Sequence, residues 1–342
     1  MRDILEDVTK WMEQGTEIAL ATVVQTWGSS PRQEGAKMAI TERGEIAGSV
    51  SGGCVESAVA EVGLQVLKSG SPQLLHFGVA DETAWSVGLA CGGSLDVFVE
   101  RLDPKQFEFL KGLLISEVPA ASVTIVRGPD ADVGRKITLS TSDPSARYGS
   151  LDSGSDDPTV ELALQVTEPS LHELEPEGLQ AFVDLMPPPP TLIVVGGNQI
   201  AIGLSKLAKT MDMRTVIVDP RRAFATKDRF PEVDQLLQAW PAKAFESVPL
   251  TASTAVVMLT HDPKIDEPAL ELALSSPAFY VGALGSKRTQ AKRRERLKER
   301  GLSEVDIDRL HGPVGLELGA DTPDEIALSI MAEIVASRHS DG

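Results

Sequence analysis

The residues best suited to chemistry lie in a glycine-rich turn around one of the two cysteines of this chain. The turn reads Ser51-Gly52-Gly53-Cys54, and we predict that a helix starts near Cys54 and runs to about Lys68. Backbone amides at the start of a helix bind anions, and the same field favours a thiolate in the first helical turn. Gly52 and Gly53 have no Cβ, so a ligand can approach the backbone closely. We therefore expect Ser51, Gly52 and Gly53 to be backbone anion donors, and Cys54 to be a nucleophilic, persulfide-bearing or metal-ligating sulfur.

The alternative for Cys54 is a small buried apolar residue, which is a common use of cysteine. The second cysteine, Cys91, also precedes two glycines, Gly92 and Gly93. Cysteines from two tight turns could face one pocket, although packing at the start of a strand also explains Cys91. Arg32 follows a turn after the first predicted strand and is a further candidate for anion contact, or else an ordinary surface residue.

Other catalytic and metal-binding patterns are not found in the sequence. Two cysteines in 342 residues exclude a disulfide scaffold and an all-cysteine zinc site. The five histidines lack metal-ligand spacing, and no HExxH, GxSxG or P-loop motif is present. His261 closes a predicted strand and His311 lies before the last predicted segment; either could be a site residue, but a structural role is the simpler interpretation. We therefore predict no metal-ion site made by the chain itself.

A second glycine-rich turn, Gly196-Gly197-Asn198, follows an apolar run at 192–195. In dinucleotide-binding folds such a turn places a pyrophosphate at a helix N-terminus. Asp219 lies 23 residues after Gly196, at the end of the second predicted strand, where a carboxylate can hold ribose hydroxyls. Because Asn198 stands at the second glycine position, NAD(P) binding is only weakly indicated. In the alternative, the sheet is a scaffold and Asp219 caps a turn.

The elements that must position these turns differ between the two halves of the chain. The N-terminal half is predicted to be α+β, with strands near 17–26, 37–41 and 95–100. The C-terminal half alternates helices with strands near 192–195, 215–218, 235–237, 255–259 and 279–282. Such alternation is typical of a Rossmann-like, doubly wound parallel sheet. We therefore predict an α/β protein with an N-terminal domain over 1–186, a stiff proline linker over 187–190 and a C-terminal domain over 191–342.

Charge is distributed unevenly along the chain. The net charge is −18, with 32 Lys plus Arg against 50 Asp plus Glu, which argues against nucleic acid or an anionic membrane as a partner. Residues 129–190 carry twelve acidic and three basic side chains, and we predict a solvated acidic insertion at about 140–158. Residues 287–300 carry eight basic and two acidic side chains on a predicted helix, either a solvated face or a docking surface.

Neither an internal repeat nor a targeting or membrane-spanning segment is recognisable in the sequence. The first residues are acidic where a signal peptide would be basic, and no apolar run approaches the roughly 18 residues of a membrane helix. We therefore expect a cytoplasmic protein with reduced cysteines and no membrane span.

The ordered motifs of both halves together resemble the xanthine dehydrogenase accessory protein family, also called XdhC/CoxI. The resemblance covers about 10–100 and 187–337. In the first half it rests on Gly28-Ser29-Ser30-Pro31-Arg32, Gly35-Ala36-Lys37-Met38, Gly52-Gly53-Cys54-Val55-Glu56 and Cys91-Gly92-Gly93. In the second half it rests on Val218-Asp219-Pro220-Arg221, Thr260-His261-Asp262 and the segments 280–288, 311–316 and 319–327. The first Rossmann turn departs from the Gly-Ala-Gly-His that is usual in the family.

The resemblance implies a chaperone of the molybdenum cofactor, more a maturation factor than a conventional enzyme. Such proteins bind the molybdopterin cofactor, promote replacement of an oxo ligand by sulfur, and deliver the cofactor to an enzyme resembling xanthine dehydrogenase. Cys54 is where cofactor or sulfur would be engaged, supported by Cys91, Gly92, Gly93 and Arg32. The partners implied are a client molybdoenzyme and a cysteine desulfurase-type sulfur donor, and a homodimer is a further expectation.

Two competing functions follow from the residues alone. The first is an NAD(P)-dependent oxidoreductase that uses the C-terminal sheet, with Asp219 on the ribose. The second is a scaffold for interactions without chemistry of its own.

Overall fold

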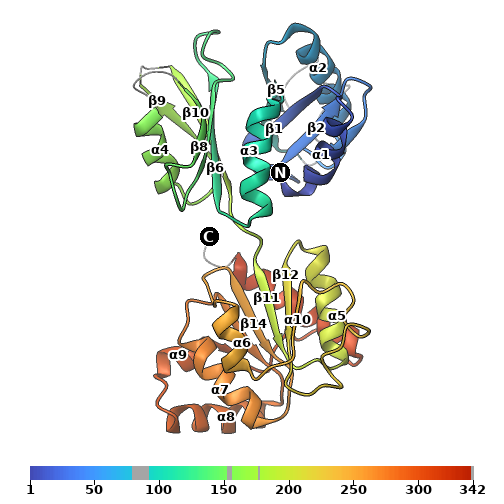
Figure 1. Ribbon diagram of the computed structural model, residues 1–342, viewed down its shortest axis with the longest axis vertical. Helices are drawn as coiled ribbons and strands as arrows, with labels where there is room; N and C mark the ends of the chain where they lie inside the picture. Colours follow the sequence, from blue (N-terminus) through green and yellow to red (C-terminus); the bar gives the residue numbers. More distant parts are fainter. Residues whose placement is uncertain (79–91, 152–155, 176–177, 340–342) are drawn as a thin grey trace. The chain divides into compact units, whose positions relative to one another are not determined.

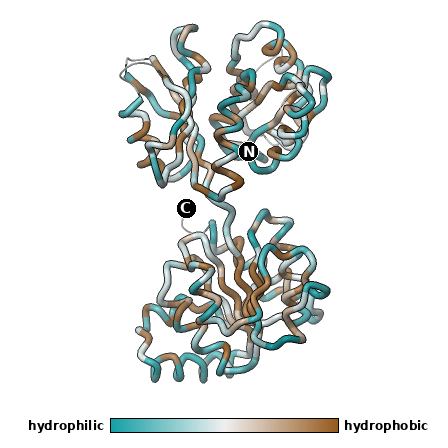
Figure 2. The backbone as a smooth tube through the Cα atoms, viewed as in Figure 1, coloured by the Kyte–Doolittle hydropathy of each residue, from teal (hydrophilic) through white to brown (hydrophobic). Residues whose placement is uncertain are grey.

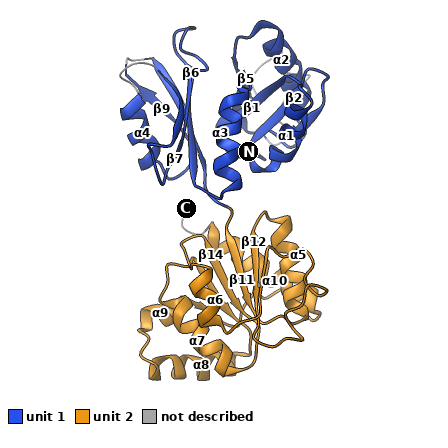
Figure 3. Ribbon diagram, viewed as in Figure 1, with its two compact units in different colours: residues 1–188 blue, residues 189–342 orange. Residues whose placement is uncertain are grey.

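The chain forms two compact units, Met1–Pro188 and Pro189–Gly342 (Figure 3). The computed structural model describes residues 1–78, 92–151, 156–175 and 178–339. The boundary falls within the run of four prolines that precedes the second sheet. Each unit is described by itself below. In the described residues, no helix combines the length and the apolar character needed to cross a membrane.

The first part of the N-terminal unit is an antiparallel sheet with a helix packed on each face (Figure 1). Its helices are α1 (Leu5–Glu13) and α2 (Glu56–Ser69), preceded by a short 3-10 turn, Arg2–Ile4. Its strands are β1 (Ile18–Trp27), β2 (Lys37–Thr41), β3 (Ile46–Gly48), β4 (Gln73–Phe77) and β5 (Ser94–Arg101). The strand order is β3-β2-β1-β5-β4. Alternate residues of β1, β2 and β5 form the core beneath α2.

The second part of the same unit repeats this plan. Its helices are α3 (Pro104–Ile115) and α4 (Asp156–Gln165). Its strands are β6 (Ala120–Arg127), β7 (Lys136–Ser140), β8 (Arg147–Ser150), β9 (Ser170–Leu174) and β10 (Leu179–Met186), in the order β8-β7-β6-β10-β9. Both parts run helix, three strands, helix, two strands, so the N-terminal unit contains a structural repeat that was not found in the sequence.

The two repeats share details that only the backbone register exposes. Thr22 lies opposite Lys37 in the first sheet, and Thr124 lies opposite Lys136 in the second. Gly48 and Gly149 both have positive φ, and a Cβ on either would lie under 3.0 Å from the carbonyl oxygen of Lys37 or Lys136 respectively. Other equivalent strand positions also match, such as Ala19 with Ala121 and Phe98 with Phe182, but the identical residues are too few and too widely spaced for the repeat to be recognised along the sequence.

The predicted acidic insertion at about 140–158 contains the edge strand β8 and the first residues of α4. β8 pairs with β7, and α4 begins at Asp156, so these residues are not simply a solvated loop. Strand β8 is an edge strand with mostly exposed side chains, and its polar composition is therefore close to that of a loop.

The C-terminal unit is a parallel six-stranded sheet in the Rossmann order β13-β12-β11-β14-β15-β16. The strands are β11 (Thr191–Val195), β12 (Arg214–Val218), β13 (Gln235–Leu237), β14 (Thr254–Met258), β15 (Tyr280–Ala283) and β16 (Leu310–His311). The central strands are hydrophobic throughout, as Figure 2 shows, because helices cover both faces.

Those helices divide between the two faces of the parallel sheet. One face carries α5 (Gln199–Thr210) and α10 (Pro323–Arg338), and the other α6 (Pro241–Ser247), α7 (Pro263–Leu274), α8 (Lys287–Glu299) and α9 (Glu304–Asp308). This arrangement confirms the predicted fold class, an α+β N-terminal region followed by a Rossmann-like, doubly wound sheet. It also explains Asn198, whose side chain caps α5 by accepting from the Ala201 amide at 3.1 Å.

Candidate functional site

Three glycine-containing turns meet at one end of the first sheet of the N-terminal unit. The turn after β1 lies against Gly93, because a Cβ on Gly93 would be 2.6 Å from the Ser29 carbonyl oxygen. The same turn approaches the cysteine turn, where a Cβ on Gly52 would be 3.7 Å from the Pro31 side chain. The structure therefore brings together the predicted residues Arg32, Ser51–Cys54, Gly92 and Gly93, while Cys91 lies outside the described residues.

A carboxylate to which the sequence motifs assigned no role organises the cysteine turn. Glu56, the first residue of α2, accepts hydrogen bonds from the Ser51 amide at 2.9 Å, the Gly53 amide at 2.9 Å and the Ser51 hydroxyl at 2.6 Å. It also accepts from the Ser49 hydroxyl at 2.5 Å and from the amides of Val50 and Val55. Burial alone would raise the pKa of Glu56, but the hydrogen bonds from Ser49 and Ser51 lower it to about 2.

The turn consequently differs from the open anion site that we predicted. The Gly52 amide donates to the Ser49 hydroxyl at 2.8 Å, and the Ser51 and Gly53 amides donate to Glu56. The prediction of free backbone donors is wrong for this structure, because the chain supplies its own anion at the helix start. Glu56 could have been recognised as a carboxylate at the first position of a helix, a place that favours negative charge.

Cys54 stands just outside α2 rather than in its first turn. The helix N-cap is Val55, and the Cys54 amide donates to the Ser51 hydroxyl at 2.9 Å. The side chain is half-buried against the core beneath α2 and is not in a disulfide. The structure therefore presents one partly accessible thiol on a turn whose backbone is held rigidly.

Arg32 is hydrogen-bonded to the cysteine turn. Its Nε donates to the Ser49 carbonyl oxygen at 3.1 Å, and its Nη2 pairs with Asp3 at 3.1 Å. The Arg32 side chain is 37% exposed, so it is also accessible to solvent. Its predicted role as an anion contact stays a prediction, whereas its contact with the cysteine turn is a feature of the fold.

An aromatic and charged group borders the same end of the sheet. Trp27 packs edge-on to His76 with ring centroids 5.8 Å apart, and His76 Nδ1 lies 2.6 Å from Asp96. Asp96 is buried and also accepts from Arg127 at 2.9 Å, which ties the first sheet to the second. These residues lie far apart in sequence, and no spacing rule would have grouped them.

The first Rossmann turn is closed by the chain itself. Asp219 is fully buried and accepts from the Gly197 amide at 2.8 Å and from two guanidinium nitrogens of Arg221 at 2.9 and 2.7 Å. Burial would raise the pKa of Asp219, but Arg221 and the Gly197 amide hold it below its ordinary value. A Cβ on Gly197 would overlap the Phe224 carbonyl oxygen, so the segment after β12 covers the turn. These residues do not fit a dinucleotide, because both the amide and the carboxylate are already engaged.

A separate pocket of about 460 Å³ lies at the carboxyl ends of β11 and β14, where doubly wound sheets bind ligands. It is lined by Asn198, Arg221, Phe224, Leu259, Thr260, His261, Asp262 and Pro263. Asp262 caps α7 by accepting from the Lys264 amide at 3.0 Å, and the Arg221 guanidinium lies 4.0 Å over the Phe224 ring.

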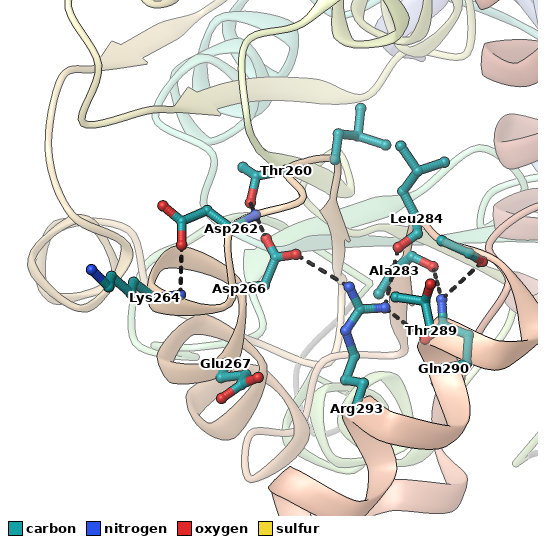
Figure 4. Close-up of polar contacts among 12 residues, drawn as sticks. Thr260, Asp262, Lys264, Asp266, Glu267, Ala283, Leu284, Thr289, Gln290 and Arg293 are labelled. Carbon is teal, nitrogen blue, oxygen red and sulfur yellow. Dashed lines mark hydrogen bonds and ion pairs between the residues drawn. The ribbon is translucent and has the colours of Figure 1, made fainter.

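Thr260 connects this pocket to a buried polar network between α7 and α8 (Figure 4). Thr260 donates to Asp266, and Asp266 pairs with Arg293 at 3.2 Å, with both side chains almost fully buried. Figure 4 shows Arg293 reaching from α8 toward Asp266 and Gln290. Burial raises the pKa of Asp266 to about 6, although Thr260 and Arg293 oppose the shift. The network joins the pocket wall rigidly to the basic helix.

The basic helix α8 is mostly neutralised by neighbouring carboxylates. In the described residues, five basic side chains of this helix or of the residue that follows it form ion pairs with surface carboxylates: Lys287–Glu317, Arg294–Asp308, Arg296–Glu267, Lys298–Glu304 and Arg300–Glu271. Arg293 is buried in the network described above. The strong positive surface suggested by the composition is thus largely compensated within the unit.

Family models and curated relatives match both units. Residues 192–334 match the XdhC Rossmann domain, and residues 11–78 match the XdhC and CoxI family. The chain is 29% identical over 334 residues to a probable xanthine dehydrogenase subunit of Bacillus subtilis (strain 168), spanning 96% of this chain and 95% of that protein. It is 28% identical over 339 residues to the molybdenum cofactor insertion chaperone PaoD of Escherichia coli (strain K12), spanning 98% of this chain and 88% of that protein.

A solved structure supports the same relationship. A crystal structure described as a xanthine dehydrogenase from Bacillus halodurans superposes with a TM-score of 0.80 at 26% identity, covering 99% of this chain and 96% of that chain. Matches to both units by models of one family, together with full-length relatives, confirm the resemblance seen in the motifs. This chain belongs to the XdhC and CoxI family.

Proposed function

We propose that this chain is an accessory factor that binds molybdenum cofactor as its cargo and delivers it to a molybdoenzyme resembling xanthine dehydrogenase. Cys54 would contact the metal of the cargo or the sulfur destined for it. The observation that carries the proposal is the junction of three turns around Cys54, where one half-buried thiol sits on a backbone held by Glu56 and Arg32. The names of two relatives, a cofactor insertion chaperone and a xanthine dehydrogenase subunit, point the same way.

The internal repeat supports a chemical rather than a structural use of Cys54. In the second repeat, Leu151 donates its amide to Asp156 at the start of α4, as Ser51 does to Glu56 at the start of α2. Residues 151–156 read Leu-Asp-Ser-Gly-Ser-Asp and contain no cysteine. The strands and helix that flank the turn therefore form without a thiol, which leaves Cys54 available for function.

The other parts of the proposal concern partners and place of action. A cysteine desulfurase-type donor would supply sulfur at the Cys54 turn, and the protein would work in the cytoplasm beside its client. The cargo combines a soft metal with an anionic phosphate, which suits a thiolate and a cation. The Arg32 guanidinium contacts the turn and is the candidate for the phosphate.

The test is retention of cofactor by purified protein. Wild type, Cys54→Ser and Ser116→Ala are purified without oxygen from cells that make molybdenum cofactor, and the pterin is quantified by fluorescence after oxidation. We expect pterin with wild type and with the exposed control Ser116→Ala, and at least tenfold less with Cys54→Ser. Equal amounts of pterin in all three proteins would show that Cys54 is not needed for binding. The absence of pterin from all three would contradict the whole proposal.

The same preparations decide between this role and an NAD(P)-dependent oxidoreductase. Because Asp219 and the Gly197 amide are already engaged with each other, we expect no heat on titration with NAD or NADP. Micromolar binding that is lost in Asp219→Ala would favour the oxidoreductase instead.

A further inference from the structure

A polar cavity of about 260 Å³ lies between the two sheets of the N-terminal unit, away from the face that α2 covers. We call it the inter-sheet cavity. Its polar wall is made by Thr22, Lys37, Glu100, Ser122, Thr124, Lys136, Thr138 and Asp184. Exposed residues such as Arg101, Asp103 and Ser150 also line it, so the cavity reaches the surface. Most of these polar groups pair with one another, and the opening to the surface lets a ligand reach them.

Two ion pairs cross the cavity in equivalent positions of the two repeats. Lys37 of the first sheet pairs with Asp184 of the second at 2.7 Å, and Lys136 of the second sheet pairs with Glu100 of the first. Gly35 makes room for this arrangement, because Asp184 Oδ1 lies 3.1 Å from where its Cβ would stand. The Gly35–Lys37 part of the family-like motif is thus explained by the cavity and not by the cysteine turn.

The repeats differ inside the cavity, and the second repeat is more polar. Leu20 and Ala39 lie opposite each other in the first sheet, where the second sheet has Ser122 and Thr138. The Thr22 hydroxyl accepts from Lys37 at 3.1 Å. Its counterpart Thr124 is only 7% exposed and lines the cavity.

No hydrogen bond to the Thr124 hydroxyl comes from any residue in the described ranges. In the described residues this oxygen is not among the fully buried polar atoms that lack a partner, so it is accessible from the cavity and free to bond to a ligand or to water there.

We propose that the inter-sheet cavity binds the pterin ring of the cargo; this inference rests on the proposed function. The amino-oxo edge of a pterin offers N–H donors to a carboxylate and a carbonyl oxygen to an ammonium or hydroxyl group. Asp184 or Glu100, Lys37 or Lys136, and Thr124 would supply those three partners. The carboxylates and lysines can do so while they stay paired with each other, because a carboxylate has about four acceptor sites and an ammonium has three donors.

The size and the walls of the cavity suit a ring rather than the complete cofactor. Phe98 and Phe182, which pack together at the cavity, add an apolar surface for a flat ring. The volume is below the roughly 300–1,000 Å³ of sites that enclose larger ligands. Strand β2 joins the cavity to the cysteine turn, because the Ser49 amide donates to the Lys37 carbonyl oxygen at 3.0 Å.

The test uses 6-methylpterin, which has the ring without dithiolene, phosphate or metal. Binding to the full-length chain is followed by quenching of pterin fluorescence, with 6-methyllumazine, which has an oxo group in place of the 2-amino group, as the comparison ligand. Thr124→Val removes the unpaired hydroxyl at constant shape, and Ser122→Leu fills the cavity with the residue that the first repeat has there. Thr167→Val, an exposed position of the same unit, is the matched control.

We expect wild type and Thr167→Val to bind 6-methylpterin more tightly than 6-methyllumazine. Thr124→Val should bind 6-methylpterin about tenfold more weakly than wild type does, and Ser122→Leu should lose binding. Circular dichroism and cooperative unfolding identify variants that are folded. If folded Thr124→Val and Ser122→Leu bind like wild type, the cavity is not the site. If wild type does not bind 6-methylpterin but still purifies with cofactor, this inference fails and the proposed function stands. If wild type neither binds 6-methylpterin nor purifies with cofactor, this inference and the proposed function both fail.

Discussion

At the scale of single residues, Glu56 is the main determinant of the candidate site. A carboxylate that receives several hydrogen bonds is stabilised in its charged form, and bonds to charged groups contribute about 1.5–3 kcal/mol each. Its partners Ser49, Ser51 and Gly53 are the residues that shape the approach to Cys54. The geometry of the thiol therefore depends on a residue that does no chemistry itself.

Glu56→Gln should lower the free energy of unfolding by about 1–3 kcal/mol, because an amide accepts fewer hydrogen bonds than a carboxylate and the amides of the turn lose partners. Urea denaturation at pH 7 measures the change. Glu61→Gln, at an exposed position of the same helix, is the matched control and should change stability little.

This difference should also depend on pH. The pKa of Glu56 is lowered from its ordinary value of 4.5 to about 2 in the folded protein, so its stabilising effect is complete above pH 4.5. It is lost as the pH falls toward 2, and the gap between wild type and Glu56→Gln should shrink over that range. A gap that stays constant from pH 7 to pH 3 would contradict the assignment of charge to Glu56.

At the scale of elements, two glycines in equivalent edge strands allow the two sheets of the N-terminal unit to form. Gly48 ends β3 next to the cysteine turn, with φ of 78°, and Gly149 has φ of 87° in β8. At both positions a carbonyl oxygen of the neighbouring strand occupies the place of a Cβ. The turn that carries Cys54 thus depends on a close approach of two backbones.

Gly48→Ala should destabilise the N-terminal unit more than Gly44→Ala does. Both glycines have nearly the same positive φ, 78° and 80°, so both substitutions bring the backbone strain of about 1–3 kcal/mol. Only Gly48 adds overlap with Lys37 and Ile4, because nothing lies within 4 Å of a Cβ on Gly44. Overpacking adds about 1–3 kcal/mol, which thermal unfolding can resolve. Equal losses for the two variants would show that Lys37 and Ile4 yield to the methyl group.

At the scale of the whole molecule, each hydrophobic core belongs to one unit. The clusters of buried residues in the described ranges lie either before the proline run or after it. Stability should therefore be divided between two cooperative units rather than shared across the boundary.

Fragments 1–188 and 189–342 should each fold when made alone. Each should show a single cooperative urea transition by circular dichroism, because each retains its complete cores. A fragment that stays unfolded while the full chain folds would show that the units depend on each other for stability.

Several features could be predicted because they depend on local patterns. The strands and helices of the C-terminal unit alternate regularly, and each β-α-β step favours one handedness, so the pattern alone indicated the Rossmann-like sheet. The glycine turns at Ser51–Cys54 and Gly92–Gly93 were recognisable for the same reason, since glycine marks places where the backbone turns tightly.

The sequence by itself therefore determined the fold class, the family and the glycine turns around Cys54. Only the tertiary structure decided which groups occupy those turns: Glu56 takes the place expected for an external anion, and Arg221 and Gly197 engage Asp219 in the place expected for a dinucleotide. The internal repeat and the inter-sheet cavity also emerged only there. Local structure depends on neighbouring residues and can therefore be predicted from the sequence. Partners such as Lys37 and Asp184 lie far apart in the chain and meet only when the two sheets face each other.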